Sequence, residues 1–101
     1  MSVLARRLKA ARLRKELSQE RLGVLAGIDE ASASARMNQY ERGKHSPDWL
    51  TVERLAGVLE VPVAYFYVVE DDMAEMLLRF HGLKQSDRLM VMKFLDELQG
   101  I

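Results

Sequence analysis

Apolar residues recur at helical spacing along most of the chain, and this pattern predicts an all-α protein. The first apolar stripe consists of Leu4, Leu8 and Ala11. It predicts an amphipathic helix over residues 3–16, in which basic side chains, among them Arg7, surround the apolar face. Arg12 lies four residues after Leu8, at the buried edge of the stripe, where a cation is costly without a partner. A partner for Arg12 is therefore expected elsewhere in the chain.

Two shorter helical patterns follow the first one. Ser18 is a favourable N-cap for a helix over residues 19–26, and Gly27 supplies the left-handed residue that ends it. A second helix is expected over residues 33–42, and it stops at Gly43. Two short helices joined by a turn are the arrangement with which a helix-turn-helix reads duplex DNA.

The second helix of this pair has the more informative side chains. The segment before it, residues 29–32, is small and polar, and it predicts a turn longer than a tight helix-turn-helix requires. Met37 and Tyr40 form the inward face, while the side chains left to project are Ser34, Arg36, Asn38 and Gln39. Guanidinium and amide groups can make paired hydrogen bonds to guanine and adenine edges, although an ordinary solvated helix face has a similar composition.

Two further elements follow. Asp48 is expected to cap a helix that runs to Leu59 and has Trp49 as a core or rim aromatic side chain. A short fifth helix then opens at Pro62, because proline is favoured in the first turn of a helix.

The last third of the chain contains two more helical patterns. The acidic run at Asp71 and Asp72 predicts a solvated junction, where one of these residues caps a helix that ends near Gly82. Ser86 is expected to cap a final helix through Gln99. That helix is apolar around more of its circumference than one small core covers, so we expect it to dock on a second copy. The residues of this dimer or partner surface are Met90, Val91, Phe94, Leu95 and Leu98.

Charge separates the two ends of the chain. The 101 residues are 49% hydrophobic, enough for one compact domain with a modest core, and the net charge is zero. Through Arg54 there are 11 basic and 7 acidic side chains, whereas from Leu55 onward there are 4 and 8. Unless this asymmetry is accidental, the basic part favours a polyanionic partner, and the acidic part faces away from it.

Composition argues against several other classes of protein. The chain contains no cysteine, and no uncharged run approaches the roughly 20 apolar residues of a membrane span. His45 and His81 are isolated, and neither paired carboxylates nor a metal-ligand spacing occurs, so we expect neither an enzyme nor a cofactor. The basic N-terminus superficially suits a transit peptide, but it coincides with the first helix, and the default expectation is a cytoplasmic protein without a membrane partner.

Several short motifs, taken in order, resemble one known family. They are Arg7-Leu8-Lys9 with Arg12, Leu17-Ser18-Gln19-Glu20-Arg21-Leu22, Ala26-Gly27-Ile28, Asn38-Gln39-Tyr40-Glu41-Arg42-Gly43-Lys44, Pro47, and Leu55-Ala56 with Leu59 and Val61. Over residues 5–66 the chain resembles the lambda-repressor and Cro-like helix-turn-helix regulators, also called the xenobiotic-response-element type. Each fragment alone is weak, but together and in this order they are specific.

The resemblance implies a five-helix DNA-binding domain, which we place at residues 1–69. The helical tail at residues 70–101 lies outside the family pattern, and we expect it to mediate dimerisation. It implies that Ser34, Arg36, Asn38 and Gln39 face the major groove, the base-reading set. It places phosphate contacts at Gln19, Arg42 and Lys44, the phosphate set. It also implies an internal ion pair between Arg12 and Glu41.

The chain departs from the family pattern in three places. The stretch from Gly27 to Glu41 is about four residues longer than usual, which leaves the start of the recognition helix open. Ala35 replaces what is often a longer polar side chain. Glu60 and Pro62 stand where a glycine and a polar cap are common, a change expected to alter the local cap more than the function.

Two functions fit these features. The first is a sequence-specific regulator of transcription, a repressor that binds double-stranded DNA as a homodimer on a near-palindromic operator. The second is an antitoxin-type module, whose C-terminal helices bind a partner protein while the front of the chain binds the operator. Methionines suit an adaptable surface of that kind, although they also suit a core or a homodimer seam. They are Met73, Met76, Met90 and Met92.

Overall fold

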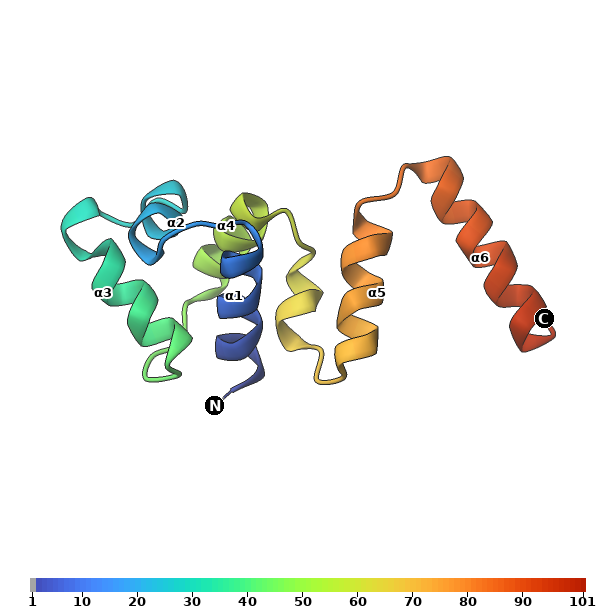
Figure 1. Ribbon diagram of the computed structural model, residues 1–101, viewed down its shortest axis with the longest axis horizontal. Coiled ribbons are helices and arrows are strands. Elements are labelled where there is room, and N and C mark those ends of the chain that lie inside the picture. Colours follow the sequence, from blue (N-terminus) through green and yellow to red (C-terminus); the bar gives the residue numbers. More distant parts are fainter. Residues whose placement is uncertain (1) are drawn as a thin grey trace.

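The computed structural model describes residues 2–101, and Figure 1 shows them as a row of helices. The elements are α1 (Val3–Arg14), α2 (Gln19–Leu25), α3 (Glu30–Glu41), α4 (Trp49–Leu59), the 3₁₀ helix η1 (Val63–Tyr67), α5 (Asp71–His81) and α6 (Gln85–Gln99). No strand occurs in these residues, and the expected all-α class is confirmed. We call α1–α4 with η1 the head, and α5 with α6 the tail.

Each element of the head contributes at least one large, fully buried apolar side chain to the core. These residues are Leu8, Leu22, Met37, Phe66 and, from α4, Val52, Leu55 and Leu59. Phe66 comes from η1, which lies against α1 and so closes the side of the core that the four α-helices leave open. The fifth element was expected as a helix and is a 3₁₀ turn, with Pro62 as its N-cap in extended conformation.

Hydroxyl and carboxylate side chains begin three of the helices. Ser2 Oγ accepts the backbone N–H of Ala5 at 3.1 Å, and Ser18 Oγ accepts that of Arg21 at 3.0 Å. Asp48 Oδ1 accepts the N–H of Thr51 at 2.9 Å, as expected from its N-cap position. Hydrogen bonding from Thr51, first from its side chain and then from this backbone N–H, lowers the pKa of Asp48. These local bonds set where α1, α2 and α4 start, independently of packing.

The start of α3 differs from the expectation. The helix begins at Glu30, three residues before the expected start at residue 33, so the small polar segment lengthens the helix and does not lengthen the turn. Four residues separate α2 from α3, an ordinary length for a helix-turn-helix, and Gly27 adopts a φ of 91° within them. The backbone N–H of Ile28 then donates to the carbonyl of Gly23 at 2.9 Å and completes the turn.

The tail meets the head at Arg7, which was expected on the polar side of α1 but is buried. Its Nε donates to the carbonyl of Val68 at 3.0 Å and its Nη2 to that of Val69 at 3.0 Å. Its Nη1 lies 3.0 Å from Asp71 Oδ1, and Arg6 Nη1 donates to the same oxygen at 3.1 Å. The hydrogen bonds from Arg6 and then Arg7 hold the pKa of Asp71 below its ordinary value.

The acidic junction is exposed to solvent, as expected, and Asp71, whose side chain is 83% exposed, is in addition paired with two arginines. The N-cap of α5 is Glu70, without a side-chain hydrogen bond, so neither expected aspartate caps the helix in this way. Ser86 is likewise not the cap of α6, because that helix begins at Gln85 and its N-cap residue is Lys84, two residues before the expected cap. The ends of both helices follow the expected boundaries, because α5 ends at Gly82 and α6 ends at Gln99.

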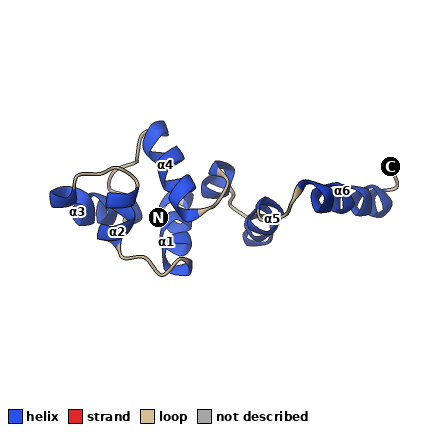
Figure 2. Ribbon diagram, turned by 90° about the horizontal axis from the view of Figure 1, so that it is seen from above, coloured by secondary structure: helices blue, strands red, loops and turns tan. Residues whose placement is uncertain are grey.

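The two tail helices are held very differently. α5 lies beside η1 and buries Ala74 against the core (Figure 1). α6 has no buried residue and stands apart from the head in both Figure 1 and Figure 2. Arg88 bridges the two helices, donating from Nε to the Phe80 carbonyl at 3.1 Å and from Nη2 to the His81 carbonyl at 2.9 Å. No helix in residues 2–101 is long and apolar enough to cross a membrane.

Candidate nucleic-acid interface

The helix α3 has one buried and one open face. Its buried residues are Ala33, Met37, Tyr40 and Glu41. All four members of the base-reading set are exposed to solvent. At about 100° per residue, Asn38 and Gln39 lie nearest the centre of the open face, on either side of Ala35. Ser34 and Arg36 lie on its two flanks, so the four side chains cover a broad arc and not a single row.

The packing of α2 against α3 depends on Gly23. A Cβ atom at this position would lie 2.9 Å from Ala33 Cβ and 3.2 Å from the Ala33 carbonyl oxygen. Such distances are shorter than van der Waals contact, so only glycine lets the two helices approach this closely. A glycine inside α2 therefore permits the close approach of α3, the helix that holds the base-reading set.

A buried ion pair anchors the C-terminal end of α3. Arg12 Nε donates to Glu41 Oε2 at 2.6 Å, and Arg12 Nη2 donates to Glu41 Oε1 at 3.0 Å. The two side chains are 11% and 3% exposed. Arg12 Nη1 also donates to the Leu17 carbonyl at 2.9 Å, which ties the pair to the end of the α1–α2 loop. One bidentate contact thus fixes α3 relative to α1 and α2.

Gln19, expected to bind a phosphate, already has partners within the protein. Its Nε2 donates to Glu41 Oε1 at 3.2 Å and, at the longer distance of 3.4 Å, to Asn38 Oδ1. Since the amide has two N–H donors, both are committed. The side chain therefore orients Asn38 in this structure, and a phosphate contact would require it to give up the longer bond.

The other two members of the phosphate set lie where α3 ends. Arg42 is the C-cap residue, and Gly43, with a φ of 72°, turns the chain away from the helix. The backbone N–H of Lys44 donates to the Gln39 carbonyl at 3.0 Å, which returns the loop to the helix end. Both Arg42 and Lys44 are exposed, so their cations are available at one end of the open face.

The solvent exposure of two residues differs from the sequence-based expectation. Trp49 was expected in the core or at its rim, yet it is 61% exposed at the first position of α4. Arg7 was expected in solvent, yet it is buried. A signal for Arg7 was present, because it lies four residues before the buried Ala11 and so shares the edge of the apolar stripe.

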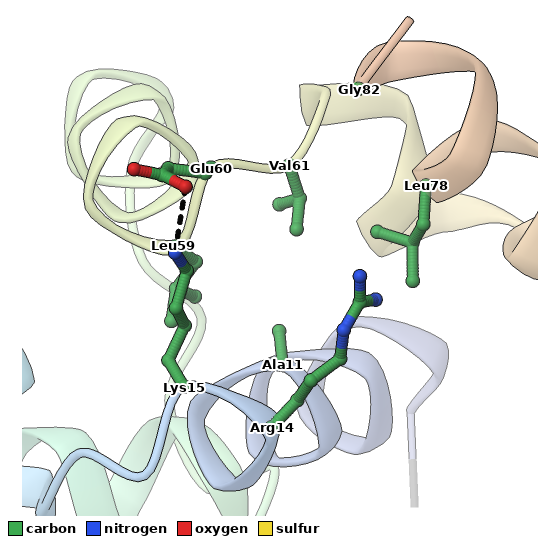
Figure 3. A pocket seen from close by; sticks show the side chains of 8 residues that line it. All are labelled: Ala11, Arg14, Lys15, Leu59, Glu60, Val61, Leu78 and Gly82. Carbon is green, nitrogen blue, oxygen red and sulfur yellow. Dashed lines mark hydrogen bonds and ion pairs between the residues drawn. The ribbon is translucent and has the colours of Figure 1, made fainter.

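Two hollows lie away from α3. One, of about 190 Å³, separates α1 from the C-terminal end of α5, and its lining includes Ala11, Arg14, Leu78 and Gly82 (Figure 3). The ion pair of Lys15 Nζ with Glu60 Oε2, at 2.7 Å, closes one side of it and lowers the pKa of Glu60. Residues 2–101 contain no group of three or more metal-ligating side chains that could hold a metal ion.

The second hollow is an apolar groove of about 430 Å³ between α5 and α6. Its lining residues are Met76, Arg79, Phe80, Leu83, Met90, Val91 and Phe94. Of the expected dimer or partner surface, Met90, Phe94 and Leu98 are exposed, and Val91 and Leu95 are half-buried. This surface is contiguous with the groove, so the tail presents one continuous apolar area.

In the head, α2 and α3 are two short helices joined by a turn, the arrangement that defines a helix-turn-helix. The sequence model of the helix-turn-helix domain family matches residues 3–65, more than half of the chain. The chain belongs to the helix-turn-helix family. A comparison with curated proteins gave no match.

The chain is also similar to a solved structure, the crystal structure of transcriptional regulator BswR. The two chains are 49% identical and superpose with a TM-score of 0.88. The alignment covers 96% of this chain and 94% of the other. Since nearly the whole length is covered, the similarity includes tail as well as head.

Proposed function

We propose that this protein regulates transcription by binding a specific sequence of double-stranded DNA, and that it represses by occupying a promoter. The exposed base-reading set on α3, a helix held by the buried Arg12–Glu41 pair, is the observation that supports this most directly. The family match and the similarity to a transcriptional regulator point the same way. A rigid helix with amides and a guanidinium group on its open face is suited to the major groove.

Within this proposal, α3 enters the groove with Asn38 and Gln39 at the centre of the contact. Each amide can make a bidentate pair of hydrogen bonds with an adenine edge, and Arg36 can pair with a guanine. The absence of a long side chain at Ala35 leaves room for the helix to lie close to the bases. Arg42 and Lys44 hold the phosphates at the end of the helix, and Gln19 either joins them or keeps Asn38 in position.

The proposed regulator is a homodimer that joins through its tail. α6 has no buried residue, and Phe94 alone leaves 59% of its surface exposed. An isolated helix with an uncovered apolar face is unfavourable in water, and a second copy would cover the same face on both chains. Two heads joined in this way would bind half-sites about one helical turn apart.

Selection of binding sites from random duplex DNA tests the proposal. We expect an enriched motif with two related half-sites. Gln39→Ala should then relax the preference at particular base positions, whereas Lys44→Ala should weaken binding to all sequences alike. Lys9→Ala, which removes an exposed cation from α1, is the control for a simple change of charge. A selection without an enriched motif would rule out sequence-specific binding.

The antitoxin-type alternative has one observation in its favour, the open apolar groove between α5 and α6. A helix from a different protein could occupy that groove in place of a second copy. The molecular mass of the purified chain in solution distinguishes a homodimer from a chain that needs a different protein partner. A stable dimer at micromolar concentration favours the homodimer, whereas a monomer with the groove uncovered favours a different protein partner.

A further inference from the structure

Two arginines outside the proposed DNA-contacting residues hold the joints of the molecule. The Arg7 joint connects the head to α5 through Arg7, the carbonyls of Val68 and Val69, and Asp71, with the three distances all 3.0 Å. The guanidinium carbon of Arg7 also lies 5.7 Å from the ring centroid of Tyr65. A planar group bonded along two edges and packed against a ring has little freedom to rotate.

The Arg88 joint repeats this construction between α5 and α6. Arg88 donates to the carbonyls of Phe80 and His81, at 3.1 and 2.9 Å, and its guanidinium carbon lies 5.0 Å from the Phe80 ring centroid. Carbonyls in the last turn of a helix have no partner inside the helix. Arg88 donates to two of them from the following helix, of which the Phe80 carbonyl also accepts the backbone N–H of Leu83 at 3.1 Å, and so fixes the direction in which α6 leaves α5.

The exposed Arg6 adds two bonds to the Arg7 joint, to Asp71 Oδ1 at 3.1 Å and to the Val69 carbonyl at 3.3 Å, but apolar packing adds little to either joint. Ala74 is the one buried residue of α5, and α6 has none. At its C-terminal end α5 is separated from α1 by the hollow of about 190 Å³ seen in Figure 3. The orientation of the tail relative to the head therefore depends on arginine side chains, of which Arg7 is the buried one at the first joint and Arg88 forms the second, more than on apolar packing.

We propose that Arg7 and Arg88 are positioning residues that set the spacing between the two half-sites the protein accepts. The inference rests on the proposed function, since spacing has meaning only for two heads joined through their tails. The molecule is 53 Å long, and a rotation of about 10° acting over about half of that length displaces a head by about 5 Å, more than the rise of about 3.4 Å per base pair. If a joint allowed a rotation of this size, the protein would bind operators whose half-site spacings differ by one base pair with similar affinity.

The stiffness of the joints is tested first, without DNA. Because the chain contains no cysteine, single cysteines at the exposed positions Glu53 and Gln99 allow two spin labels to be attached. With labelled chains diluted in an excess of unlabelled protein, electron–electron double resonance gives the distance between α4 and α6 within one chain. We expect a narrow distribution that widens about twofold in Arg7→Ala and Arg88→Ala, and not in Lys9→Ala.

Spacing is then measured on the site that the unmodified protein selects, with one or two base pairs inserted between the half-sites. We expect the insertion to lower the DNA affinity of the unmodified protein by about tenfold or more. The affinity of Arg7→Ala or Arg88→Ala should fall by about threefold or less, because a flexible connection tolerates a changed distance between the half-sites. Affinity for a single half-site should stay the same in all variants. If Arg7→Ala does not fold, Arg7→Lys keeps the charge and the aliphatic stem but cannot make the paired bonds.

Each outcome decides the proposal. Wider distances together with lost discrimination between spacings support it. A distance distribution that stays narrow in both variants overturns it, and so does unchanged discrimination despite wider distances. If the unmodified protein selects only single half-sites, the dimer of the proposed function is wrong and there is no spacing to set, a failure distinct from the other two.

Discussion

Replacement of Glu41 by glutamine would show how much the head depends on its buried ion pair. The change preserves the size of the side chain but leaves the Arg12 guanidinium, which is 11% exposed, without a counter-ion. Arg12 keeps its bond to the Leu17 carbonyl at 2.9 Å and loses charge-assisted bonds at 2.6 and 3.0 Å. Removing one member of a buried ion pair lowers the free energy of unfolding by about 3–5 kcal/mol. Because a neutral amide can retain one hydrogen bond to Arg12, we expect the free energy of unfolding to fall by about 3 kcal/mol.

Urea unfolding followed by far-ultraviolet circular dichroism measures this loss. The double variant Arg12→Met with Glu41→Leu contains no unpaired charge, and we expect it to lie within about 1 kcal/mol of the unmodified protein. Lys15→Met, which breaks the exposed pair with Glu60, is the control and should change the unfolding midpoint much less. A loss below about 1 kcal/mol in Glu41→Gln, or a double variant as unstable as the single one, would refute the reasoning that an unpaired buried cation causes the effect.

Three further predictions concern other parts of the molecule. Gly23→Ala should lower the free energy of unfolding by about 1–3 kcal/mol, because the new Cβ overlaps α3. Gly57→Ala should raise it by up to about 1 kcal/mol, because no atom lies within 4 Å of the new Cβ and alanine favours a helix. Thermal melts of both variants test these two expectations. Since its arginine partners lower the folded-state pKa of Asp71, the stability from this group is present above pH 3.8 and is lost as the pH falls through the folded pKa. Asp71→Asn should therefore narrow the difference between urea midpoints at about pH 7 and about pH 3, and an unchanged difference would contradict the pairing. Lys44→Ala should reduce the slope of log affinity against log salt by about 0.9 if this side chain neutralises one phosphate, as salt titrations of DNA binding would show.

The elements with local signals were predictable from the sequence. Ser18 and Asp48 are caps because their side chains accept a backbone N–H three residues ahead. This interaction depends on four consecutive residues only, so the local sequence is enough to predict it. The need for a partner to Arg12 also followed from its place on the apolar stripe, and the resemblance supplied Glu41. Glu60 has a φ of 57°, so it adopts the left-handed conformation for which a glycine is common at this point in the family.

The features that depend on distant parts of the chain were not predictable in the same way. Alanine and serine at positions 31–34 are compatible with a turn or a helix, and the contact of Ala33 with Gly23 decides for the helix. Arg7 binds the backbone carbonyls of Val68 and Val69, and carbonyl acceptors are present at every residue, so no sequence pattern marks them. The direction of α6 has the same origin, because Arg88 also binds carbonyls.

The position of the single tryptophan has a practical consequence for spectroscopy. Trp49 is 61% exposed in the folded chain, so its indole already contacts water before the protein unfolds. Its emission should therefore change little during denaturation, and fluorescence would understate the loss of the core. The same residue should respond strongly, with a shift toward shorter wavelength, to any molecule that covers the start of α4.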